Sequence, residues 1–212
     1  MKKIKQMKIL QIIKANIITN KKEYILVTLI FLVGVFLGVM FINNIGDSQI
    51  EEIKTYLVEF IDKLKNTESL NTFSLLKTTL KQNTILAILL WFFGTTVIGI
   101  PIVFGIIMYR GFCLGYSISS IIVTIGTGKG IAFSLITLLL QNIIFVPAII
   151  ALGVSGFKLY KSIVKDKNRE NIKIEVLRHT IFSIIMLIIL YVASIVEIVI
   201  STNFLKIFVK YF

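Results

Sequence analysis

The few side chains that could do chemistry in this chain stand alone. The only histidine, His179, follows Arg178 at the start of an apolar run, and the only cysteine is Cys113. A zinc site needs three or four nearby His, Cys or carboxylate ligands, and no such set is present. Glu197 is the one carboxylate inside an apolar run, so the paired acids of an intramembrane protease are missing too. We therefore expect an interfacial histidine, no catalytic residues, no metal site and no cofactor.

One glycine-rich segment resembles a phosphate-binding loop only superficially. The sequence Gly126-Thr-Gly-Lys-Gly130 lacks the glycine spacing of a P-loop, and no Ser or Thr follows its lysine. The Gly-x-Ser-x-Gly motif of serine hydrolases does not occur either. We interpret the segment as a flexible turn between two apolar runs.

The elements that hold these residues are long apolar runs separated by short basic segments, as a lipid bilayer requires. Hydrophobic residues make up 56% of the 212-residue chain and charged residues only 16%, against about 25% in soluble domains. The sequence predicts one polytopic, all-α integral membrane domain with about five transmembrane helices. The predicted spans are residues 24–43, 83–109, 111–126, 131–154 and 180–200.

The basic residues predict the orientation of these spans. Seven of the 23 Lys and Arg residues lie in residues 2–22 and seven more in residues 158–178. Cytoplasmic loops carry such an excess, so the N-terminal segment 1–23 and the loop 158–178 should face the cytoplasm and touch anionic lipid. Because the net charge of +12 is concentrated there, it does not indicate a nucleic-acid partner.

The same rule decides whether the short third run crosses the membrane. If residues 111–126 did not cross, the basic loop 158–178 would face outward, against the positive-inside tendency. Five crossings place Arg110 at the inner surface. They also place the loop 44–82 and the tail 201–212 outside a multi-pass protein of the cell membrane.

The outer loop, residues 44–82, has its own helical pattern. Ser48 and Glu51 have the spacing of a capping box, and a second amphipathic piece runs through residues 73–80. We predict an extracytoplasmic amphipathic helical hairpin between spans 1 and 2. Its apolar stripe must rest on the bundle, on lipid or on a partner. The residues predicted to bind a partner are Ile50, Ile53, Leu57, Ile61 and Leu64, with Phe204 and Phe208 of the tail.

Small and polar residues inside the spans predict helix packing. Gly34 and Gly38, like Gly111 and Gly115, are GxxxG pairs that bring helices together, within one chain or between two copies. Pro101 should kink the second span, because proline removes a helical hydrogen bond. The remaining predicted packing residues are Gly94, Gly99 and Gly105 in that span and Gln141, Asn142 and Pro147 in the fourth.

Four strings in this order resemble the stage II sporulation protein M family: residues 31–38 (FLVGVFLG), 99–105 (GIPIVFG), 110–117 (RGFCLGYS) and 141–148 (QNIIFVPA). The resemblance covers almost the whole chain. It implies a sporulation protein of the septal and engulfing membrane that scaffolds two cell-wall-degrading partners, stage II sporulation proteins D and P. Where the wider superfamily has a His-Gly pair and a glutamate, this chain has Gln141, Asn142 and Phe145.

Two functions therefore follow from the sequence. The leading hypothesis is a non-enzymatic membrane scaffold that anchors peptidoglycan-degrading partners during endospore formation. The alternative is a small-solute transporter or channel subunit that uses the kinked second span and Glu197, since broken helices and intramembrane carboxylates line transport sites.

Overall fold

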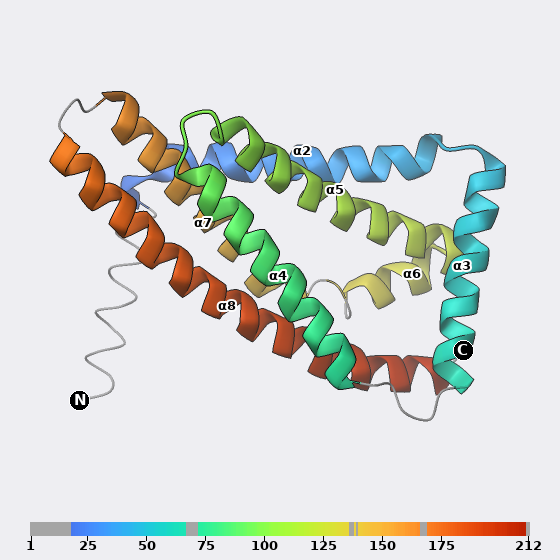
Figure 1. The fold of residues 1–212 in the computed structure, drawn as a ribbon. Helices are drawn as coiled ribbons and strands as arrows, with labels where there is room; N and C mark the ends of the chain where they lie inside the picture. The colour runs from blue at the N-terminus through green and yellow to red at the C-terminus, as the bar shows by residue number, and fades with distance from the viewer. Residues whose placement is uncertain (1–17, 67–71, 136–137, 139, 166–168, 211–212) are drawn as a thin grey trace.

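The fold is a bundle of long helices with two further helices at one end (Figure 1). The computed structural model describes residues 18–66, 72–135, 138, 140–165 and 169–210, and these contain no strand. The bundle consists of α2 (Lys21–Asn44), α4 (Thr72–Gly94), α5 (Ile100–Ile125), α7 (Leu140–Lys165) and α8 (Arg169–Lys210). At one end lie α3 (Asp47–Asn66) and α6 (Thr127–Ser134). The predicted all-helical class is confirmed.

The outer surface of the bundle is apolar, as contact with lipid requires. Phe36 on α2 and Ile188 on α8 are 62% and 58% exposed, and they belong to a large set of exposed aliphatic and aromatic side chains. A contiguous apolar surface of this size would be unfavourable in water. Four described helices are long and apolar enough to cross a bilayer: Lys21–Asn44, Ile100–Ile125, Asn142–Val164 and Ile172–Val199. The protein is therefore a multi-pass membrane protein.

Helix α4 is the fifth long helix of the bundle, and its first half is polar. It packs against α8, α7 and α5. Its 23 residues extend about 35 Å, which is enough to cross the hydrocarbon core. The buried side chain of Asn83, in the polar half, faces α8 rather than lipid. The piece predicted over residues 73–80 is thus the start of α4, and α3 packs against α5 and α8 instead of forming a hairpin with it.

The predicted second span, residues 83–109, is wrong in its position. Helix α4 ends at Gly94, and α5 begins at Ile100 and continues through the predicted third span, residues 111–126. The Thr95 and Thr96 hydroxyls donate to the carbonyls of Phe92 and Phe93 and so help to satisfy the end of α4. The turn also contains Val97 and Ile98, which make the apolar run look continuous in the sequence.

The later boundaries also differ from the predicted ones. The span predicted over 131–154 is divided between α6 and α7, and the basic loop predicted over 158–178 is mostly helical. Helix α7 continues to Lys165 and α8 begins at Arg169, so the span predicted over 180–200 is the middle of a much longer helix. These helices continue beyond the apolar core through segments rich in charged residues. A hydropathy window does not predict such segments as part of a span. The first span, predicted at 24–43, agrees closely with α2.

Glycines let α2 and α5 meet backbone to backbone. A Cβ atom added to Gly34 would collide with the Met108 carbonyl oxygen, and one added to Gly38 with that of Phe112. Reciprocally, Gly111 and Gly115 lie against the carbonyl oxygens of Phe31 and Val35. The two predicted GxxxG pairs therefore face each other within one chain, where van der Waals contact replaces the hydrophobic effect as the source of association.

The basic residues of three helices gather at one end of the bundle. The Lys161 ammonium on α7 lies 2.7 Å from the Glu23 carboxylate at the start of α2. Tyr24, Lys158 and Arg178 line one small pocket at this basic end. Helix α3 lies at the opposite end (Figure 1). One long helix, α2, lies between the N-terminal basic segment and α3. Three long helices, α4, α5 and α7, lie between α3 and the basic segment where α7 ends and α8 begins. Both numbers are odd, as the predicted topology requires.

We predict that Gly34→Ala and Gly111→Ala will each destabilise the bundle by about 1–3 kcal/mol, because the added methyl groups overpack a backbone contact. Gly105→Ala is the matched control, since nothing lies within 4 Å of the position where its Cβ would be. Thermal unfolding in detergent measures the effect. Equal stability of all three variants would contradict the assigned α2–α5 contact.

Candidate partner-binding groove

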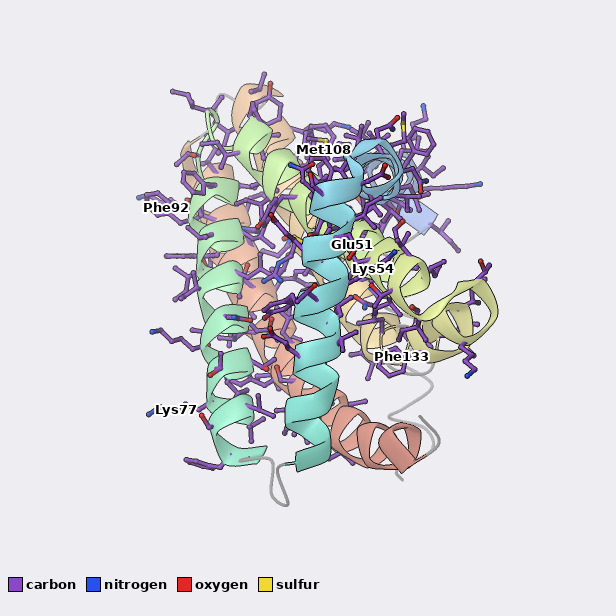
Figure 2. All side chains as sticks on the ribbon, turned by 90° about the vertical axis from the view of Figure 1, so that its right-hand side faces the viewer. Glu51, Lys54, Lys77, Phe92, Met108 and Phe133 are labelled. Atoms are coloured by element: carbon purple, nitrogen blue, oxygen red, sulfur yellow. The ribbon has the colours of Figure 1, made fainter. Side chains whose placement is uncertain are left out.

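Helix α3 lies across the end of the bundle (Figure 2), and it packs against α5. Ile50, Ile53 and Leu57 are half-buried, whereas the neighbouring Glu51 is exposed. A cavity of about 610 Å³, which we call the α3–α5 groove, separates the two helices. Its lining residues are Glu52, Ile53, Tyr56 and Leu57 of α3, Tyr116, Ser117, Ser120 and Ile121 of α5, and Leu138.

The start of α3 explains its orientation. The Gly46 carbonyl accepts hydrogen bonds from the backbone N–H groups of Gln49 and Ile50, at 3.0 and 3.1 Å. Because the helix begins at Asp47, Ser48 lies inside its first turn. The acidic Asp47 is favourable there, next to the positive end of the helix dipole. The chain thus turns sharply after α2 and α3 runs across the bundle.

The chemistry of the groove suits apolar side chains. Its walls are mainly apolar, and its volume falls in the range of about 300–1,000 Å³ typical of ligand pockets. The Ser120 hydroxyl is buried and has no hydrogen-bond partner among the described residues. Glu52 is the only carboxylate in the lining, and no histidine or cysteine accompanies it. The groove can therefore hold an apolar segment.

The structure describes the side chains of only part of the predicted partner-binding set. Ile53 and Leu57 line the α3–α5 groove, and Ile50, three residues before Ile53, is half-buried. The side chains of Ile61 and Leu64, and those of Phe204 and Phe208, lie outside the described part of the structure.

A seam of polar side chains fixes α4 on α8. The Asn83 amide donates to the Ser194 hydroxyl at 2.7 Å, and the hydroxyls of Thr84 and Tyr191 are 2.8 Å apart. Tyr191 and Ser194 recur with Glu197 at three-residue steps, so these pairs involve one polar stripe of α8. In lipid each group would otherwise lack a partner, so the pairs specify how the two helices align.

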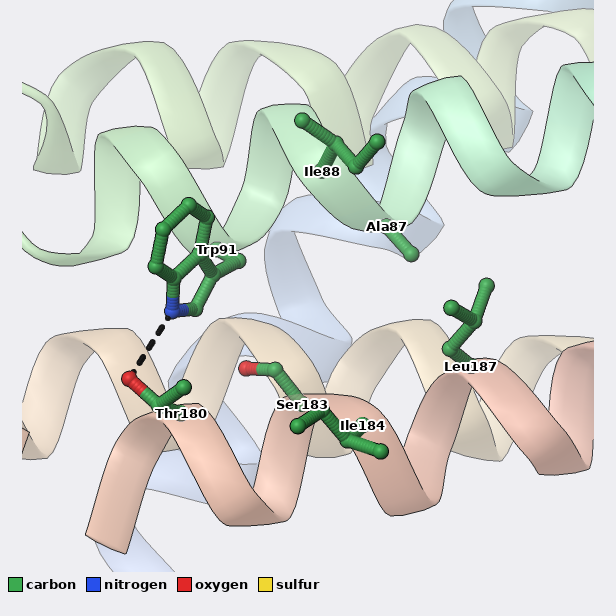
Figure 3. Close-up of a pocket in the computed structure, with 7 residues that line it drawn as sticks. All are labelled: Ala87, Ile88, Trp91, Thr180, Ser183, Ile184 and Leu187. Carbon is green, nitrogen blue, oxygen red and sulfur yellow. Dashed lines mark hydrogen bonds between the residues drawn. The ribbon is translucent and has the colours of Figure 1, made fainter. Parts of the chain in front are cut away.

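Near the basic end, the same two helices form a shallow apolar cavity of about 230 Å³ (Figure 3). The Trp91 indole N–H crosses it to donate to the Thr180 hydroxyl at 3.0 Å. Ile88 and Ile184, on its walls, are about half exposed. The cavity therefore opens toward lipid and presents no further chemistry.

The arginine expected at the inner surface lies instead in the middle of α5. The Arg110 guanidinium is 5.4 Å from the centroid of the Phe145 ring on α7. Glu197 on α8 is within electrostatic range of Arg110. These two interactions offset the free-energy cost of placing the Arg110 charge in lipid, so Arg110 can lie inside a span instead of at its end.

The predicted packing residues of the second span have different roles. Gly94 contacts Gly156 of α7 and His179 of α8, so it does allow close packing. Gly99 is part of the turn, where a Cβ would collide with the Phe93 carbonyl oxygen. Pro101 lies in the first turn of α5, where its missing N–H costs nothing, and it does not kink a span. Gly105 faces open space.

Residues of the fourth predicted span also differ from the expectation. The Asn142 amide donates to the Leu138 carbonyl of the preceding turn at 2.6 Å, not to another helix. Pro147 lies within α7 and is exposed. The side chain of Gln141 lies outside the described part. Without a kink at Pro101, one of the two features that indicated a transport site is not present, and Glu197 is the other.

Sequence reasoning missed the position of His179. This side chain is 2% exposed, at the junction of α4, α7 and α8. Its Nδ1 atom is 2.8 Å from the Ser155 hydroxyl, and Nε2 is 3.4 Å from the Trp91 carbonyl oxygen. A carbonyl only accepts, so in the neutral ring Nε2 carries the proton and Ser155 donates to Nδ1. The glycines opposite it, Gly94 and Gly156, are the only sequence signal that could have placed it there.

Comparison with known proteins identifies one family. The model of the family described as stage II sporulation protein M matches residues 27–202. No curated protein and no solved structure matches the chain. Among the described residues, no group of three or more His, Cys, Asp or Glu side chains could hold a metal ion.

We predict opposite outcomes for two buried serines. Ser194→Ala should destabilise the bundle by about 0.6–1.7 kcal/mol, because it leaves the Asn83 amide without its acceptor. Ser120→Ala should be neutral or stabilising, because the Ser120 hydroxyl has no partner to lose. Thermal unfolding in detergent compares the two. A larger loss for Ser120→Ala would contradict the assigned hydrogen bonds.

Proposed function

The chain belongs to the stage II sporulation protein M family, and from this premise we propose that it is a non-enzymatic scaffold of the sporulating cell's membrane. In this proposal it anchors peptidoglycan-degrading partners at the septal and engulfing membrane. The resemblance to the family suggests stage II sporulation proteins D and P as those partners. A family that acts in sporulation, together with several spanning helices, supports the membrane setting.

The observation that carries the proposal is the α3–α5 groove. It lies between an amphipathic helix and a spanning helix, at the end of the bundle opposite the basic residues. If the basic end is cytoplasmic, as the positive-inside tendency predicts, the groove opens on the side where peptidoglycan lies. An apolar helix of a membrane-anchored partner would reach it from within the bilayer and bury the exposed walls of both helices.

The composition of the groove supports binding rather than catalysis. Its hydroxyls come from two tyrosines and two serines, and Glu52 is the only carboxylate in the lining. The one Ser–His pair in the described residues, Ser155 with His179, lies near the basic end, and the imidazole is completely enclosed. A scaffold role requires only that the groove be apolar, complementary in shape to a partner segment and on the correct side of the membrane.

We predict that the double variant Ile53→Asp with Leu57→Asp will reduce recovery of co-expressed stage II sporulation proteins D and P by about tenfold or more. Two carboxylates in the groove would have to be buried without partners when an apolar segment docks. The measurement is pull-down of the tagged chain from detergent extracts, with quantification of both partners.

The matched control places the same two charges on the other face of α3. Thr55→Asp with Val58→Asp adds two aspartates at exposed positions outside the groove. This control should retain the partners, and both variants should elute as monodisperse protein. Unchanged recovery with Ile53→Asp and Leu57→Asp, or equal loss in the control, would exclude the groove as the docking surface.

A further inference from the structure

A small polar pocket lies at the basic end, far from the α3–α5 groove. It encloses about 60 Å³ between the starts of α2 and α8 and the last half of α7. Its polar lining consists of Tyr24, Ser155, Lys158 and Arg178, with Val154 and Phe182 among the apolar residues. One water needs at least about 10–15 Å³ of such space, so the pocket has room for a group the size of a phosphate.

The charges around this pocket do not cancel. Lys161 is paired with Glu23 at 2.7 Å, and one nitrogen of Arg178 is paired with Glu175 at 2.6 Å. In the described part of the chain Lys158 has no salt-bridge partner, although it acts on Glu23 electrostatically. Among the described residues around the pocket, three cations therefore face two carboxylates, and the excess of one positive charge is complementary to a single anion.

The donors at the pocket suit the oxygens of a phosphate. Arg178 keeps further N–H groups after its contact with Glu175, and a guanidinium binds phosphate oxygens in a fixed geometry. Lys158 adds a second cation from another helix, and Tyr24 adds a phenol. Ser155 contributes less to anion binding, because its hydroxyl proton is donated to His179. A metal-binding role does not fit this set, since the lining contains no acid.

The depth of the pocket indicates where such an anion comes from. Tyr24 lies in the first turn of α2, and the apolar part of that helix begins directly after it. The pocket thus opens where the bilayer changes from hydrocarbon to headgroups. We propose that Lys158, Arg178 and Tyr24 form a specific binding site for one phosphate-bearing anion, of the class that an anionic phospholipid headgroup presents.

The proposal is tested with the intact purified chain in detergent micelles. The chain's single tryptophan, Trp91, lies near the pocket, because its carbonyl contacts the histidine that holds Ser155. Energy transfer from Trp91 to dansyl-labelled phosphatidylglycerol measures binding. Lys158→Gln with Arg178→Gln should weaken binding about 30-fold, which corresponds to removing two cations near an anionic headgroup.

A charge-matched control separates a specific site from a diffuse basic surface. Lys22 and Lys173 are exposed at the same end and do not line the pocket. Lys22→Gln with Lys173→Gln removes the same charge and should weaken binding by less than about threefold, because exposed charges farther away are screened. Equal weakening by both double variants, or equally tight binding of dansyl-phosphatidylcholine, would overturn the proposal.

Competition with soluble glycerol phosphate identifies the source of the anion. If millimolar glycerol phosphate does not displace the labelled lipid, the site takes a headgroup at the membrane surface. Displacement would support the same phosphate site and assign it to a soluble ligand. Both double variants should elute as monodisperse protein, so that lost binding reports on the pocket rather than on folding.

Discussion

Contact between the backbones of α2 and α5 determines where the rest of the molecule can lie. Two helices in lipid gain little from burying apolar side chains against each other, so their association depends on close van der Waals contact. Gly34 and Gly38 lie against the main chain of α5, and Gly111 and Gly115 lie against the main chain of α2, so the two backbones are in direct contact there. Because α5 is held this way, α3 can lie across its far half and α7 and α4 can pack on its other sides. The groove exists because α5 cannot move toward α3 without leaving α2.

Much of this arrangement could be predicted from residue types, and the failures have identifiable causes. The membrane class, the first span, the α3 stripe and the glycine pairs all depend on local composition and period, which the sequence contains. The turn at residues 95–99 was missed because Val97 and Ile98 continue the apolar run, although Thr95, Thr96 and Pro101 are signals of a helix end and a helix start. The positions of charged and polar groups were harder to predict, because their partners lie on other helices. The partner of Arg110 is 35 residues away in the sequence, and those of His179 are 24 and 88 residues away.

The two ends of the bundle differ in chemistry, and this difference links the structure to its proposed role. One end carries a cluster of cations around a small polar pocket, and the other carries an amphipathic helix over an apolar groove. Anchoring the first end in headgroups would fix the depth and orientation of the bundle. The second end would then present the groove at a constant height above the opposite surface. A scaffold that positions wall-degrading partners needs such a fixed geometry more than it needs reactive groups.

The orientation of the two ends is the central claim, and cysteine accessibility on intact cells measures it directly. With Cys113 replaced, single cysteines are introduced at Ser48 in α3, at Thr96 in the turn between α4 and α5, and at Lys173 in α8. A membrane-impermeant maleimide should label Ser48→Cys on intact cells, and should label Thr96→Cys and Lys173→Cys only after the membrane is permeabilised. Labelling of Thr96→Cys or Lys173→Cys from outside would contradict the account, because the groove would then face away from the peptidoglycan.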